Sequence, residues 1–233
     1  MRGRRSAGRA LGVSEYMQLL RWSFRDEPPS TRPLYFSGRH LRRARVGVGL
    51  VLLGECALRA CEARRVCFSS FIGCAAVGGV WVVNPEVAKG RRARMCYASA
   101  FVLSVLRWWA AVTDELYGAF EWQNWPVVWS GLSTGYGARG FQAIFQRAGR
   151  QVLGRDVWPH DLRRMAAERM RGAADVRAAQ QLLGHASLET TQRYLDASLS
   201  KVAAACELLG AQAAACCGVA EVTAVAQSAQ SVT

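Results

Sequence analysis

An uncharged stretch in the first half of the chain limits the possible fold classes more than any other feature. Residues 66–84, VCFSSFIGCAAVGGVWVVN, carry no charged side chain, so a membrane span has to be considered. Glycine at two places, a serine pair and the β-branched, aromatic run VGGVWVV are instead typical of a buried β-hairpin. We therefore expect strands in this stretch, with a small membrane-associated protein as the weaker alternative.

Helical patterns lie on both sides of this stretch. Apolar residues recur at helical spacing in residues 38–65 and 99–120, and shorter helices are predicted downstream, one of them starting at a proline in WPHDLRRMAAERMRG. The segment VAKGRRARMCY predicts a second hairpin with Lys-Gly-Arg-Arg at its tip. The tryptophans are expected to pack in the core and the connector rather than to stack on bases; they are residues 108, 109, 122, 125, 129 and 158. The fold class expected is α+β, mostly helical, with a small antiparallel sheet.

The ends of the chain differ in composition from the centre. Residues 1–37 are polar, rich in arginine and contain DEPPSTRP, which predicts a flexible or poorly packed basic leader. Residues 38–205 form the expected catalytic domain. Residues 206–233 are rich in alanine and serine, and we expect this tail either to be disordered or to dock on a neighbouring subunit.

The charge balance indicates a polyanionic partner. The net charge is +13 and the sequence pI is about 10.1, which favours nucleic acid over an anionic membrane surface. The segments GRHLRRAR and QRAGRQVLGR are candidates for contact with a DNA backbone. Of the 30 basic residues only Lys89 and Lys201 are lysines, and a lysine, unlike an arginine, can give up its proton. Lys89, at the predicted hairpin tip, is therefore a candidate catalytic residue.

The cysteines and the N-terminus indicate a cytoplasmic protein. The chain has 8 cysteines but no CxxC pair and no Cys/His spacing that suits zinc, so neither a metal nor another cofactor is expected. The N-terminal segment MRGRRSAGRALG is basic and lacks the apolar core of a signal peptide. Free thiols in the cytoplasm are the simplest interpretation.

Several potentially reactive side chains occur at regular spacings. His160 and Arg163 lie three residues apart in a predicted helix and so project from one face. His185 follows a helix stop at Leu-Leu-Gly, and Tyr194 lies nine residues further on. Arg59 forms a second pair of the i, i+3 spacing with Glu62 in an earlier apolar helical stretch, where an unpaired guanidinium would be costly to bury; that pairing, or one with Glu55, could equally be structural.

Taken together, these residue types describe a phosphodiester site. Two guanidinium groups can neutralise the oxygens of a phosphate and of its pentacoordinate transition state. A tyrosine hydroxyl is a nucleophile once a base removes its proton, a lysine can protonate a leaving alkoxide, and a histidine can serve as the base. No metal is needed when guanidinium groups hold the charge.

At these residues the sequence resembles the tyrosine recombinase, or phage integrase, family. PHDLRRMAAERM is similar to the family's H-x-x-R segment, and LLGHASLETTQRY is similar to its L-G-H…Y segment. LLGECALRACE resembles the segment with the first arginine, and VAKGRRAR resembles the hairpin with the family's lysine. The matches follow the family order over residues 38–205. The chain resembles a catalytic domain alone, as in the short fimbrial-switch inverting recombinases, without a complete N-terminal core-binding domain.

The resemblance implies a tyrosine-recombinase-like catalytic domain and a role for each residue. Tyr194 would attack the scissile phosphate to give a 3′-phosphotyrosyl intermediate, while Arg59 and Arg163 clamp the phosphate. The other implied roles are general acid for Lys89, proton transfer from the tyrosine for His160, phosphate binding for His185 and support of the first arginine for Glu62.

The resemblance also implies the partners: double-stranded DNA with specific recombination sites, a homo-tetramer on that DNA and no membrane. Site-specific recombination includes integration of mobile elements. Some features depart from the family pattern. Arg164 stands where the family usually has a histidine, an uncharged stretch replaces an acidic strand after Glu62, and the spacing from Arg59 to Lys89 is long. A degenerate DNA-binding relative that does not cut, a truncated integrase and a type IB topoisomerase-like enzyme therefore remain as alternatives.

Overall fold

The computed structural model describes residues 10–25, 38–71, 79–83, 94–118, 124–130, 135–183 and 195–219. In chain order its elements are α1 (Val13–Phe24), α2 (Gly38–Gly54), α3 (Ala60–Ala63), the 3-10 helix η1 (Phe68–Phe71), β1 (Gly79–Val83), β2 (Arg94–Ala98), α4 (Ala100–Tyr117), α5 (Ala138–Leu153), α6 (Pro159–Ala173), α7 (Val176–Leu182) and α8 (Leu195–Cys217). The predicted α+β class, mostly helical with a small antiparallel sheet, is confirmed.

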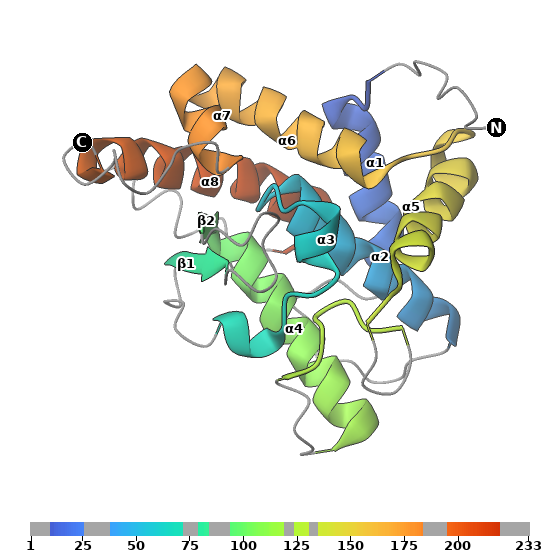
Figure 1. Cartoon of the computed structure of the whole chain (residues 1–233). Coiled ribbons are helices and arrows are strands. Elements are labelled where there is room, and N and C mark those ends of the chain that lie inside the picture. Colours follow the sequence, from blue (N-terminus) through green and yellow to red (C-terminus); the bar gives the residue numbers. More distant parts are fainter. Residues whose placement is uncertain are drawn as a thin grey trace.

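The helices pack around α2, and the sheet lies at the edge of the helical body (Figure 1). Helix α2 contacts α1, α4, α5 and α6, and β2 contacts α4, α7 and α8. Strands β1 and β2 pair antiparallel with Gly79 opposite Ala98. The helices of the described ranges are all too short or too polar to cross a membrane.

The sheet differs in detail from the sequence prediction. Of the uncharged stretch 66–84, only β1 is a strand in the described residues, and η1 occupies the start of the stretch. The partner of β1 is β2, which is the second half of the predicted basic hairpin, so in the described residues the end of the uncharged stretch pairs with this basic segment. The predicted tip with Lys89 lies outside the described residues.

The prediction of a poorly packed leader is wrong for residues 10–25. Helix α1 places Tyr16, Leu19, Leu20 and Phe24 on one face, and all four side chains are buried in the main core. These positions have the i, i+3, i+4, i+8 spacing of an amphipathic helix. The surrounding arginines and prolines dominate the composition of residues 1–37 and hide this pattern.

The expected free tail is likewise corrected for residues 206–219, because α8 packs within its own chain. Ala213, Ala214 and Val219 are buried in the main core, and α8 contacts α1, α4, α6 and α7. Glu207 accepts hydrogen bonds from the Tyr97 hydroxyl at 2.9 Å and from the first backbone amide of α4, on Ala100, at 3.0 Å. Small side chains let α8 approach its neighbours closely, so a composition rich in alanine here reflects tight packing.

Trp108 and Trp109 of α4 and Trp129 of the connector form part of the core, as predicted. Trp122 lies outside the described residues. Trp109 and Trp129 are fully buried and stack with their ring centres 5.3 Å apart. The Trp109 indole Nε1 donates to the Val127 carbonyl at 2.7 Å, which satisfies the only polar group of that side chain. Trp108 is also buried and meets Phe24 of α1 edge to face.

A close backbone approach after α5 gives a first testable prediction. A Cβ built on Gly149 would lie 2.6 Å from the Arg155 carbonyl oxygen and 2.9 Å from the Val157 backbone nitrogen. Gly149→Ala is therefore expected to destabilise the protein by about 1–3 kcal/mol, since a backbone segment must move. Urea unfolding measures the loss. Gly172 of α6 has open space around it, so Gly172→Ala should be neutral or stabilising, and equal losses at both sites would contradict this prediction.

Candidate active site

Helix α6 begins where the sequence predicts and buries the second arginine of the candidate site. Pro159 is the first residue of the helix, and the Asp161 carboxylate accepts from the Trp158 backbone amide at 3.0 Å. Leu162 and Met165 face the core, and Arg163 is also buried. The helix therefore holds the Arg163 guanidinium inside the protein rather than on its surface.

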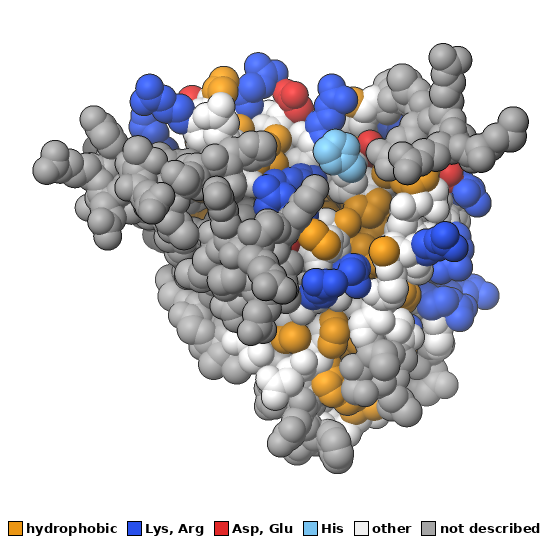
Figure 2. Space-filling model, in the orientation of Figure 1, with side chains coloured by type: hydrophobic (Ala, Val, Ile, Leu, Met, Phe, Trp, Pro, Cys, Tyr) orange, Lys and Arg blue, Asp and Glu red, His pale blue; other side chains and the backbone are white. Residues whose placement is uncertain are grey.

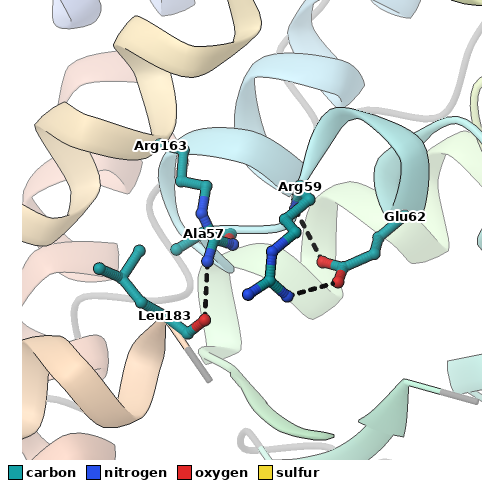
Figure 3. Close-up of polar contacts among 5 residues, drawn as sticks. All are labelled: Ala57, Arg59, Glu62, Arg163 and Leu183. Atoms are coloured by element: carbon teal, nitrogen blue, oxygen red, sulfur yellow. Dashed lines mark hydrogen bonds and ion pairs between the residues drawn. The ribbon is translucent and has the colours of Figure 1, made fainter. Parts of the chain in front are cut away.

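Arg163 joins two segments that are far apart in the sequence (Figure 3). One terminal nitrogen donates to the Ala57 carbonyl, and the other donates to the Leu183 carbonyl at 2.7 Å. Ala57 lies two residues before Arg59, and Leu183 lies two residues before His185. The guanidinium is thus placed between the segment with the first arginine and the segment that leads to the predicted histidine.

Arg59 is not inside a helix, which corrects the prediction of one helix over residues 38–65. Helix α2 ends at Gly54, Ala57 has the positive φ of 48°, and Arg59 is the residue that caps the N-terminus of α3. Residues with a side chain rarely adopt a positive φ, so the break cannot be read from helical periodicity. The turn directs Arg59 toward the side of α2 on which Arg163 lies (Figure 3).

The predicted pair of Arg59 and Glu62 is in contact. The buried Glu62 carboxylate accepts from the Arg59 backbone amide at 2.7 Å and from its Nη1 at 2.9 Å. Glu62 is the third residue of α3, and its carboxylate bonds back to the capping residue Arg59. Such a bond favours the start of a helix after the capping residue. In the described part of the chain, Glu62 is the only hydrogen-bond partner of the Arg59 side chain. That side chain is 28% exposed, so its Nε and Nη2 can donate to a ligand.

His160 is in the first turn of α6 and is exposed, whereas Arg163 three residues later is buried. The two side chains therefore share one end of the helix but differ in their access to solvent. Lys89, His185 and Tyr194 lie outside the described residues, and their places in the site remain predictions. Helix α8 starts directly after Tyr194.

A second buried arginine of α6 was not predicted as part of the site. Arg169 Nη1 donates to Glu55 Oε1 at 2.6 Å, and the Tyr16 hydroxyl donates to the same oxygen at 2.8 Å. Burial works to lower the pKa of Arg169, but attraction to Glu55 and Tyr16 outweighs it and raises that pKa. The sequence holds a signal for this pair, because Glu55 stands in an apolar run and Arg169 is next to the buried Met170.

Arginine side chains cover part of the molecular surface. Figure 2 shows basic groups along the upper and right-hand edges of one face, where α6 and α5 lie in Figure 1. Exposed arginines of these helices are residues 139, 147, 150, 164 and 171. In the predicted DNA-contact segment GRHLRRAR, Arg43 is buried and Arg45 lies over the Trp129 ring with 4.0 Å between the guanidinium carbon and the ring centre. That segment therefore offers fewer charges to a ligand than its sequence suggests.

The described residues form a helical domain with a small sheet at its edge, in which Arg59 and Arg163 come from separate elements, and this fold is that of solved tyrosine recombinases. The fold is similar to that of the XerA recombinase, with a TM-score of 0.57 and 18% identity over 84% of this chain and 64% of that one. It is also similar to XerH in a post-cleavage complex with a difH substrate, with a TM-score of 0.58 and 20% identity over 81% of this chain and 50% of that one.

Residues 40–200 match the sequence model of the phage integrase family, and this chain belongs to that family. It is 36% identical to the tyrosine recombinase XerC of Xylella fastidiosa over 110 residues, and this aligned segment covers 46% of this chain and 35% of that protein. It is also 33% identical to XerC of Yersinia pestis over 121 residues, and this aligned segment covers 51% of this chain and 37% of that protein. The matches thus cover little more than a third of these relatives.

Proposed function

We propose that this chain is the catalytic domain of a site-specific DNA recombinase that cuts and rejoins double-stranded DNA. The observation that carries the proposal is that Arg163 of α6 donates to the Ala57 carbonyl, two residues before Arg59, which brings the two arginines from separate elements into one region (Figure 3). Two guanidinium groups at one point suit a phosphate with two negatively charged oxygens in its transition state. Membership of the phage integrase family supports the same chemistry.

In the proposed reaction the Tyr194 hydroxyl oxygen attacks the scissile phosphorus. A bond forms between the tyrosine oxygen and the phosphorus, the bond to the 5′ oxygen breaks, and a 3′-phosphotyrosyl intermediate and a 5′-hydroxyl result. The 5′-hydroxyl of another strand then attacks the intermediate and releases the tyrosine. The number of phosphoester bonds is unchanged, so the reaction needs no ATP, and the arginines supply the positive charge without a metal.

The other predicted site residues have roles in proton transfer and phosphate binding. Lys89 protonates the leaving 5′ oxygen, and His160, which is exposed at the start of α6, accepts the tyrosine proton. His185 binds the phosphate, and Glu62 holds Arg59 in place through one hydrogen bond from its backbone amide and one from its guanidinium.

The partners follow from the same proposal. XerH was solved with its difH substrate, which supports double-stranded DNA as the ligand of this related fold. The exposed Arg139 and Arg147 of α5 and Arg164 of α6 contact the DNA backbone, whereas Arg171 at the other end of α6 is paired with Glu168. The active form is a homo-tetramer on two recombination sites in the cytoplasm. Arg163→Lys and Arg171→Lys, compared below, separate the active-site arginine from a surface arginine of the same helix.

A suicide substrate tests the function directly. A duplex with a recombination site from the neighbourhood of the gene, nicked next to the scissile phosphate, loses a short 5′-hydroxyl fragment on cleavage and cannot be resealed. The wild-type chain is expected to form an adduct that survives denaturing electrophoresis. Tyr194→Phe is expected to form none, since the phenylalanine ring has no nucleophile.

The outcomes separate the alternatives. DNA binding without an adduct in the wild type identifies a non-cleaving relative, and an adduct that persists in Tyr194→Phe excludes Tyr194 as the nucleophile. Relaxation of supercoiled DNA that lacks any recombination site identifies a topoisomerase-like enzyme. The relative orientation of two sites in a plasmid distinguishes inversion, the reaction of the short fimbrial-switch recombinases, from integration and excision.

A further inference from the structure

Arg169 bonds two elements whose relative position matters for the proposed reaction. Its Nη1 donates to Glu55 Oε1 at 2.6 Å, and its Nη2 donates to the Leu209 carbonyl at 2.9 Å. Glu55 lies in the connection that carries Arg59, and Leu209 lies in α8, which starts directly after Tyr194. One guanidinium thus joins the segment with the first arginine to the helix that follows the proposed nucleophile.

Helix α6 holds the connection before Arg59 at two points. Arg163 donates to the Ala57 carbonyl, and Arg169 donates to the Glu55 carboxylate. The two arginines are six residues apart on one helix, or about 9 Å along its axis. Contacts at two separated points fix the orientation of the connection as well as its position. Arg59 lies two residues beyond Ala57.

The cluster around Arg169 is almost free of solvent. The Arg169 and Glu55 side chains are 3% and 4% exposed, and Arg169 also lies 5.4 Å from the centre of the Tyr16 ring. A buried ion pair seldom stabilises a protein more than apolar side chains of the same volume would. The planar, forked guanidinium does define the directions of its two hydrogen bonds, so this cluster is suited to positioning.

Because α8 is long, a small change in its direction at Leu209 displaces its N-terminal end by a larger distance. The part of α8 from its first residue, Leu195, to Leu209 is about 21 Å long at the usual rise per residue. A tilt of about 5° at Leu209 moves its first residue by roughly 2 Å over such a length. A misplacement of about 1 Å in reacting groups can slow a reaction by about a hundredfold.

We propose that Arg169, acting with Glu55, is a positioning residue that sets the place of α8, the helix that follows Tyr194 in the sequence, relative to Arg59. This inference rests on the proposed function for its catalytic part. Arg169 touches neither the phosphate nor the nucleophile, and it acts through the backbone of α8 and the carboxylate of Glu55.

Four variants separate positioning from stability. Arg169→Lys keeps a charge for Glu55, but its single nitrogen cannot take the places of both Nη1 on Glu55 and Nη2 on the Leu209 carbonyl. The double variant Glu55→Met with Arg169→Met replaces the ion pair by apolar side chains of similar length. Tyr16→Phe removes one bond to Glu55 and leaves both bonds of Arg169. Arg171→Lys alters an exposed arginine of the same helix that pairs with Glu168.

The first measurement is the single-turnover rate of adduct formation on the suicide substrate at saturating protein, with the DNA dissociation constant measured separately. Arg169→Lys and the double variant should react at least about tenfold more slowly, with DNA affinity changed by less than about twofold. Tyr16→Phe and Arg171→Lys should keep the wild-type rate. All rates are taken at a temperature at which circular dichroism shows every variant folded.

The second measurement is amide hydrogen exchange, which needs no activity. Arg169→Lys should reduce protection both in residues 55–63 and at the start of α8, and Tyr16→Phe should not produce this paired change. If the wild type forms no adduct, the proposed function fails, and exchange still decides the positioning. An unchanged rate in Arg169→Lys, an equal rate loss in Tyr16→Phe, or loss of protection in only one of the two segments would overturn the proposal.

Discussion

Arg163→Lys is expected to slow formation of the phosphotyrosyl adduct by about 10²- to 10³-fold, the usual effect of removing one donor that stabilises transition-state charge. The guanidinium donates from two nitrogens to the Ala57 and Leu183 carbonyls, in directions that its planar fork fixes. An ammonium group on a shorter side chain cannot satisfy both carbonyls and a phosphate at once. The change therefore removes charge stabilisation and also loosens two segments of the site.

The rate is measured on the suicide substrate under single-turnover conditions, and DNA affinity is measured alongside. Affinity should change little, because many surface arginines contribute to DNA binding and Arg163 is buried. Arg171→Lys, an exposed change on the same helix, is the matched control. A rate loss of similar size in both variants, or none in Arg163→Lys, would contradict a role for Arg163 at the phosphate.

Trp109→Ala is expected to lower the free energy of unfolding by about 3–5 kcal/mol, the usual cost of truncating a large buried aromatic side chain. The Trp109 ring is fully buried against Trp129, and its indole nitrogen bonds the Val127 carbonyl. Truncation leaves a cavity between α4 and the connector and an unpaired carbonyl. Chemical denaturation with urea, followed by circular dichroism, gives the change.

The same variant tests whether this tryptophan binds DNA bases. DNA affinity per folded molecule should equal that of the wild type, because a fully buried ring cannot stack on a base. Trp22→Ala is the matched control, since the Trp22 side chain of α1 is only half-buried and its loss should cost clearly less stability. Weakened DNA binding by folded Trp109→Ala, or equal stability losses, would show that the packing role assigned to Trp109 is wrong.

The sequence predicts those parts of the fold that depend on local patterns. Pro159 marks the start of α6 because a proline suits the first turn of a helix, and the apolar spacing of residues 99–120 predicts α4. The antiparallel sheet follows from β-branched residues, although its register does not. The register depends on pairing between strands that are separated in the chain, and no local pattern contains that information.

The parts that the sequence hides depend on backbone conformation and on distant partners. Ala57 adopts a positive φ that helical periodicity cannot indicate, so the break before Arg59 is missed. The Arg59–Glu62 pair is predicted because it is local, with a separation of three residues. The Glu55–Arg169 pair joins residues that are 114 positions apart, so spacing alone cannot identify it.

The contact between α1 and α8 has a consequence for synthesis on the ribosome. The Cys216 thiol of α8 donates to the Met17 carbonyl of α1, which joins positions 199 residues apart. At about 5–20 residues per second, such a separation takes on the order of 10–40 s to translate. The side of α1 that α8 covers stays exposed for this whole period. A nascent chain in which α1 has already packed on α2 therefore still presents apolar surface that a chaperone can bind.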